Sequence, residues 1–210
     1  PSVVLSTLGL PVTVGKSMAI RRTVLARIGG FESFGDLLAE DAMIGRRVAR
    51  EGVRIATSFV PVENRNVGGS IGRMFERHSR WAKLRRAMSP LFFAIEPFFS
   101  PMLVALGALL LVPSRTTLLL LALAMTVQMA TSLGAASTIR RTPMPWRFVP
   151  LEVVRAMLML ACWANAVWSR TVRWRGHPLL VGRDTVVTPV NDLSGATADA
   201  HPRPQEHALP

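Results

Sequence analysis

The chain has 210 residues, 50% of them hydrophobic, and a formal charge of +12 from 25 Lys and Arg against 13 Asp and Glu. This apolar content excludes a disordered basic tail and argues against a soluble nucleic-acid binder, so no nucleic-acid partner is predicted. The single Cys excludes a disulfide framework and a Cys-rich zinc site.

The first 90 residues alternate β-rich and helical patterns, which is typical of an α/β layer. Strand patterns rich in β-branched residues occupy residues 2–8, 12–14 and 53–60. Helical patterns, each followed by a glycine or a Ser-Pro stop signal, occupy residues 20–28, 39–51 and 70–88. No GxGxxG, Walker A or DxD motif occurs, so the main nucleotide-binding half is expected to lie outside this chain.

Apolar segments follow this basic region. Residues 117–139 are 23 residues without a charge, enough to cross roughly 30 Å of hydrocarbon as a helix. Residues 149–169 are a second candidate span, and residues 98–112 are a shorter third, interrupted by Pro97 and Pro101. The third is either a span or a re-entrant hairpin. Arginines flank the second candidate on both sides, so the positive-inside rule leaves the side of the tail open.

Two adjacent carboxylates, Glu40 and Asp41, stand at the start of the helix predicted over residues 39–51. Acidic side chains there complement the helix dipole, which is a sufficient structural reason for them. The functional alternative is that Asp41 is a general base, since a base must stand near a cleft and be able to accept a proton.

Arg77, Arg80 and Trp81 have the spacing that places side chains on one helix face. Two guanidiniums and an indole on one face can bind a diphosphate and a flat ring. The alternative is a basic amphipathic helix that lies on anionic lipid. Further basic side chains follow on the same helix: Lys83, Arg85 and Arg86.

Several short motifs occur in a fixed order: residues 14–22, Gly29-Gly30-Phe31, Ala39-Glu40-Asp41, Arg77-x-x-Arg80-Trp81, Glu96-Pro97 and Trp174-Arg175-Gly176. In order and rough spacing they resemble the C-terminal half of the ceramide glucosyltransferase family, and they are similar to bacterial relatives that glycosylate hopanoid lipids. The resemblance runs from about residue 12 to residue 176.

The resemblance implies roles for particular residues. The third conserved Asp of that family's GT-A domain falls on Asp41, which becomes the catalytic base. The family's (Q/R)xxRW motif falls on Arg77, Arg80 and Trp81, with Arg at its first position. These three and Glu40 are expected to bind the substrate and its diphosphate. Two further residues are expected on the acceptor side: Gly15 and Lys16.

The first two Asp motifs of the family do not occur in the sequence, so the chain is expected to be a fragment without the nucleotide- and metal-binding half. The predicted fold is α/β, as a partial GT-A domain, followed by α-helical membrane segments. The expected parts are residues 1–90 from the catalytic domain, 91–170 with two to three membrane helices, 171–191 as a short β-like segment, and 192–210 as a disordered tail.

The implied function is that of a membrane-bound inverting glycosyltransferase that moves a sugar from a UDP-sugar to a ceramide- or hopanoid-like lipid alcohol. Asp41 would deprotonate the alcohol, and Mg²⁺ or Mn²⁺ held by the other half would stabilise the leaving UDP together with Arg77 and Arg80. The chain alone is expected to be inactive. Its 23 Arg against two Lys favour a GC-rich bacterium, and so the plasma membrane with the catalytic part in the cytoplasm.

Two other functions fit the same residues. A processive family 2 polysaccharide synthase shares the Glu-Asp and (Q/R)xxRW signatures, but it usually has more spans around a channel. A non-enzymatic membrane protein would use the basic helix over residues 70–88 to dock on anionic lipid, with Glu40-Asp41 as a helix cap.

Overall fold

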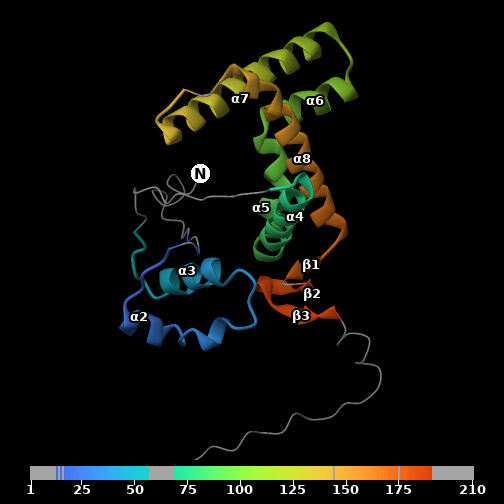
Figure 1. The fold of residues 1–210 in the computed structure, drawn as a ribbon. Helices are drawn as coiled ribbons and strands as arrows, with labels where there is room; N and C mark the ends of the chain where they lie inside the picture. Colours follow the sequence, from blue (N-terminus) through green and yellow to red (C-terminus); the bar gives the residue numbers. More distant parts are fainter. Residues whose placement is uncertain are drawn as a thin grey trace, which may run out of the picture. The chain divides into compact units, whose positions relative to one another are not determined.

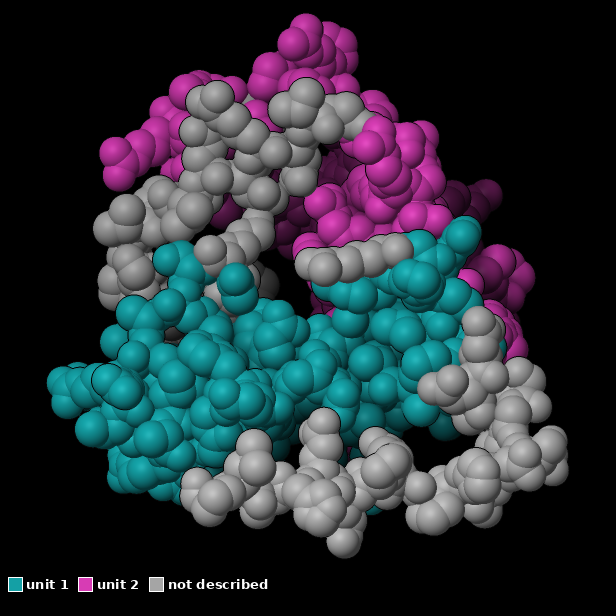
Figure 2. Space-filling model, turned by 60° about the horizontal axis from the view of Figure 1, so that its bottom comes forward, with its two compact units in different colours: residues 1–61, 170–210 teal, residues 62–169 magenta. Residues whose placement is uncertain are grey.

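The computed structural model describes residues 13, 15, 17–56, 69–143, 145–174 and 176–190. These residues are mostly helical and include one three-stranded sheet (Figure 1). The chain forms two compact units, coloured separately in Figure 2. The first unit combines Pro1–Pro61 with Arg170–Pro210, and the second is Val62–Ser169.

In the first unit, the helices predicted over residues 20–28 and 39–51 are confirmed as α2 (Arg22–Arg27) and α3 (Glu40–Arg50). Gly29 and Gly52 end them with φ values of 94° and 70°, a conformation that glycine adopts without steric cost. A 3-10 turn, η1 (Glu32–Phe34), connects the two helices. One apolar cluster joins these elements: Val24, Ile28, Phe34, Met43, Ile44 and Val48.

The strand predicted over residues 53–60 is not formed in its described part, because residues 53–56 carry no sheet pairing. Val53 and Ile55 instead pack against the apolar cluster of α2 and α3, which satisfies the alternating pattern without a strand partner. Residues 57–60 and the strands predicted over residues 2–8 and 12–14 lie outside the described residues, apart from Thr13, which is in no strand.

The sheet of the first unit comes from the C-terminal segment, where the sequence favours β structure. Strands β1 (Thr171–Trp174), β2 (His177–Val181) and β3 (Val187–Pro189) form an antiparallel sheet in the order β1-β2-β3. A 3-10 turn, η4 (Arg183–Thr185), joins β2 to β3. The expected disordered tail, residues 192–210, lies outside the described residues.

The second unit begins with α4 (Ile71–Met88), which confirms the helix predicted over residues 70–88. Ser70 caps it, since its Oγ accepts the backbone N–H of Arg73 at 3.2 Å. The elements that follow are α5 (Pro90–Ile95), η2 (Glu96–Phe99), α6 (Pro101–Leu111), α7 (Arg115–Arg140), η3 (Trp146–Phe148) and α8 (Val149–Trp168).

Two helical stretches of the described chain are long and apolar enough to cross a membrane, Arg115–Arg140 and Trp146–Trp168. Both fall where the sequence predicts spans. The shorter third segment is a pair, Pro90–Phe99 and Pro101–Leu111, bent by 78°. Pro101 has no N–H to continue the preceding turn, so it starts a new helix at the bend. The pair is either a broken span or a re-entrant loop, which makes up to three spans.

Within this unit, α6 lies beside α7, and α4 packs against α8 and α5 (Figure 1). Phe93 of α5 stacks on Trp163 of α8 at 5.4 Å between ring centroids, and the Trp163 indole donates to the Phe93 carbonyl at 2.8 Å. Arg86 of α4 donates to the Ala166 and Val167 carbonyls at 2.5 and 2.6 Å, which caps the C-terminus of α8.

Candidate functional site

The carboxylate of Asp41 is fixed at the N-terminus of α3 by two backbone amides. Its Oδ2 accepts the N–H of Gly15 at 2.7 Å, and its Oδ1 accepts the N–H of Ala42 at 2.7 Å. Thr13 anchors the same residue from the other side, because its hydroxyl donates to the Asp41 carbonyl at 2.5 Å. Two predicted site residues, Gly15 and Asp41, are thus in direct contact.

This arrangement fixes the direction in which the Asp41 carboxylate can accept a further hydrogen bond. Hydrogen bonds from two backbone amides and the positive end of the α3 dipole hold the carboxylate in one orientation. A carboxylate has about four lone-pair positions, so two hydrogen bonds leave it able to accept another from an incoming hydroxyl. Asp41 is half-buried. Glu40, the first residue of α3, is exposed, and Lys16 lies outside the described residues.

The C-terminal segment contacts the loop that precedes α3 and holds it in place. Leu37 pairs with Val186 in an isolated bridge, and the Leu38 N–H donates to the Thr185 carbonyl at 3.1 Å. The Thr185 hydroxyl accepts the N–H of Ala39 at 3.4 Å. Thr185 is 0% exposed and has a φ of 67°, which is strained for a β-branched residue and persists because these contacts hold it.

Thr185 was not predicted from the sequence, and we expect it to stabilise the position of α3. Thr185→Val keeps the shape but removes the acceptor, so the buried Ala39 N–H loses its partner and the free energy of unfolding falls by about 1 kcal/mol. Thr188→Val on exposed β3 is the matched control. Thermal unfolding of the detergent-solubilised chain measures both, and equal melting temperatures would contradict the role of Thr185.

The second predicted group lies on α4, in the other unit. Arg77 stands over the Trp81 ring, with its Cζ 5.6 Å from the ring centroid, and His78 meets the same ring edge-on at 5.1 Å. Trp81 remains 43% exposed. The structure therefore brings Arg77 and Trp81 together on one face and leaves the indole accessible for stacking.

Burial lowers the pKa of Arg80, and the like charge of neighbouring Arg77 lowers it further. An anion bound near both guanidiniums would relieve this repulsion. Leu84, which the helical spacing places on the same face, is buried. The side chains on this face are therefore exposed at Trp81 and buried one turn later at Leu84.

Three further basic residues of α4 are bound within the protein. Lys83 Nζ donates to the Ser169 hydroxyl at 3.3 Å, and burial lowers its pKa. Arg85 forms a two-pronged ion pair with Glu96, at 2.7 and 3.0 Å, and Arg86 caps α8. These contacts argue against a helix whose basic side chains are all directed at lipid.

No group of three or more His, Cys, Asp and Glu side chains able to hold a metal ion occurs among the described residues. The residues around Asp41 supply backbone amides, which are donors and do not ligate cations.

Comparison with known proteins gives one family. The model of glycosyl transferase family 21 matches residues 2–187. Ceramide glucosyltransferase 1 of Caenorhabditis elegans is 33% identical over 90 residues, which are 43% of this chain and 19% of the relative. Ceramide glucosyltransferase 3 of the same organism is 35% identical over 85 residues, 40% of this chain and 18% of the relative.

The matched segment thus spans about a fifth of these curated relatives. No solved structure matches the chain. Since the family model matches most of the chain, residues 2–187 of 210, the chain belongs to glycosyl transferase family 21.

Proposed function

We propose that the chain is part of a membrane-bound inverting glycosyltransferase that transfers a sugar from a UDP-sugar to a lipid alcohol of ceramide or hopanoid type. The observation that carries the proposal is the Asp41 carboxylate, held by two backbone amides in a chain that belongs to glycosyl transferase family 21. The names of the two relatives favour a ceramide-like acceptor.

In the proposed reaction, Asp41 takes the proton of the acceptor hydroxyl, and that oxygen attacks the anomeric carbon from the face opposite the leaving group. The bond from the anomeric carbon to the UDP oxygen breaks, and UDP leaves with the electron pair. Arg77 and Arg80 stabilise the diphosphate as its charge develops, and Trp81 orients the bound substrate. Inversion at the anomeric carbon follows from this single displacement.

We further propose that residues outside this chain complete the donor site and hold the Mg²⁺ or Mn²⁺ ion expected from the resemblance. The small share of the relatives that the match covers supports a chain that is one piece of a longer enzyme. Residues 1–90 would then be part of a GT-A domain at the cytoplasmic face of a bacterial plasma membrane. The spans at Arg115–Arg140 and Trp146–Trp168 would embed it there.

The test joins this chain to the donor-binding half of a ceramide glucosyltransferase and expresses the product in membranes. Labelled UDP-glucose and a short-chain ceramide are expected to give a labelled glycolipid of inverted anomeric configuration. A labelled polymer in place of glycolipid would identify a processive synthase. Absence of transfer from a folded, membrane-embedded product would contradict the enzymatic proposal.

A further inference from the structure

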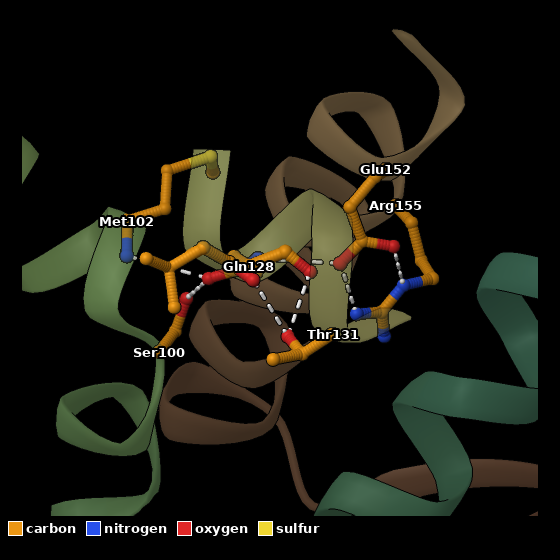
Figure 3. A network of polar contacts seen from close by, with 7 residues as sticks. Ser100, Met102, Gln128, Thr131, Glu152 and Arg155 are labelled. Atoms are coloured by element: carbon orange, nitrogen blue, oxygen red, sulfur yellow. Dashed lines mark hydrogen bonds and ion pairs between the residues drawn. The ribbon is translucent and has the colours of Figure 1, made fainter. Parts of the chain in front are cut away.

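A polar network crosses the apolar helices of the second unit (Figure 3). The Ser100 hydroxyl and the Met102 N–H donate to Gln128 Oε1, at 2.9 and 3.3 Å. Gln128 Nε2 donates to Glu152 Oε1 at 3.3 Å. Arg155 closes the network through a two-pronged contact with Glu152, at 2.5 and 2.7 Å. The network thus joins the start of α6 to α7 and α8.

Gln128, the residue that connects the network, lies midway along an apolar helix. Gln128 is the fourteenth of the 26 residues of α7, so at 1.5 Å per residue it is roughly 20 Å from either end of that helix. A glutamine amide at mid-span is costly unless its polar atoms are paired, and Gln128 is paired with Ser100, Met102 and Glu152.

A cavity of about 130 Å³ adjoins this network. Its polar wall is formed by Glu96, Ser100, Gln128 and Arg155. Its apolar wall includes Leu103, Met159, Leu160 and Trp163. An engineered cavity of about 150 Å³ holds one benzene molecule, so this one fits a small headgroup but not a whole lipid.

The charges around the cavity cancel. Glu152 is paired with Arg155, and Glu96 is paired with Arg85. Arg155 uses Nε and Nη2 for its carboxylate partner, and the contacts among the described residues leave its Nη1 without an acceptor. The site therefore offers hydrogen bonds without net charge, which suits neutral hydroxyl and amide groups better than a phosphate or a carboxylate.

We propose that this cavity binds the hydroxyl- and amide-bearing headgroup of a neutral lipid alcohol, with its alkyl chains in the surrounding hydrocarbon. This proposal concerns binding of the lipid and does not depend on that lipid being the acceptor of the proposed transfer. Arg155 and Gln128 would bind the headgroup oxygens, and the apolar wall would contact the first carbons of the chains. The binding site itself requires no transfer activity.

Photolabelling of the full 210-residue chain in nanodiscs tests this site. A ceramide with a diazirine near its headgroup is expected to label the cavity-lining residues Leu103 and Met159 in preference to the exposed residues of α7. Leu160→Trp, which fills the cavity, is expected to reduce this labelling about tenfold. Leu119→Trp, on the exposed face of α7, is the matched control and is expected to leave the labelling unchanged.

A second variant distinguishes a filled cavity from a misfolded protein as the cause of lost labelling. Leu160→Ala enlarges the cavity at the same position and is expected to retain the labelling, so loss in both variants would count against a specific site. Labelling spread evenly over α7, or equal labelling of the cavity by a diazirine phosphatidic acid, would overturn the proposal of a neutral headgroup. Specific labelling without glycolipid formation in the transfer assay would contradict the proposed function and leave the binding site standing.

Discussion

Asp41→Asn is expected to abolish sugar transfer by the joined enzyme, with a loss of roughly 10²–10⁴-fold, the usual contribution of a general base. The amide keeps the size of the carboxylate but cannot take a proton from the acceptor hydroxyl. One of its two ends carries an NH₂ group, which faces either the Gly15 or the Ala42 N–H as a second donor. The variant therefore also loses one positioning bond, a smaller effect than loss of the base.

The matched control is Glu51→Gln, which neutralises an exposed carboxylate at the other end of α3. Initial rates of labelled glycolipid formation compare the two variants, and the yield of monodisperse protein shows whether each one folds. Near-parental transfer by Asp41→Asn would remove Asp41 as the base. The carboxylate would then serve only to anchor residue 15 and to complement the helix dipole.

Local signals predict the helices of this chain well. Gly29 and Gly52 end α2 and α3, and Ser70 begins α4, because each acts on the backbone of its own turn. Asp41 could also be singled out, since a pair of carboxylates at a helix start is visible in the sequence.

Contacts between residues far apart in the chain could not be predicted from the sequence. Thr185 lies 146 positions from Ala39, and no pattern within its own short segment indicates that partner. The sequence places Glu152 near the start of an apolar span, where an interfacial position explains it. Its bond to Gln128, in the middle of another helix, depends on how α7 and α8 pack. Residues whose role comes from a partner on another element require the fold.

The double variant Arg77→Gln with Arg80→Gln is expected to reduce transfer by roughly 10²–10³-fold, because each lost donor leaves charge on the departing diphosphate unbalanced. The transfer rate of Arg80→Lys is expected to lie between those of the double variant and the parent, since lysine keeps the charge but loses the planar two-pronged geometry. The matched control is Arg50→Gln, which removes an exposed guanidinium at the C-terminal end of α3.

Transfer measured in liposomes with increasing phosphatidylglycerol separates catalysis from lipid docking. A catalytic role predicts the same fractional loss at every lipid composition, because the diphosphate is the anion that these side chains bind. A docking role predicts a loss that grows with the anionic fraction and disappears at high salt, where surface attraction is screened. The partners of Lys83, Arg85 and Arg86 within the protein favour the first result. A loss confined to anionic liposomes would assign the α4 face to the membrane surface and remove Arg77 and Arg80 from the proposed diphosphate site.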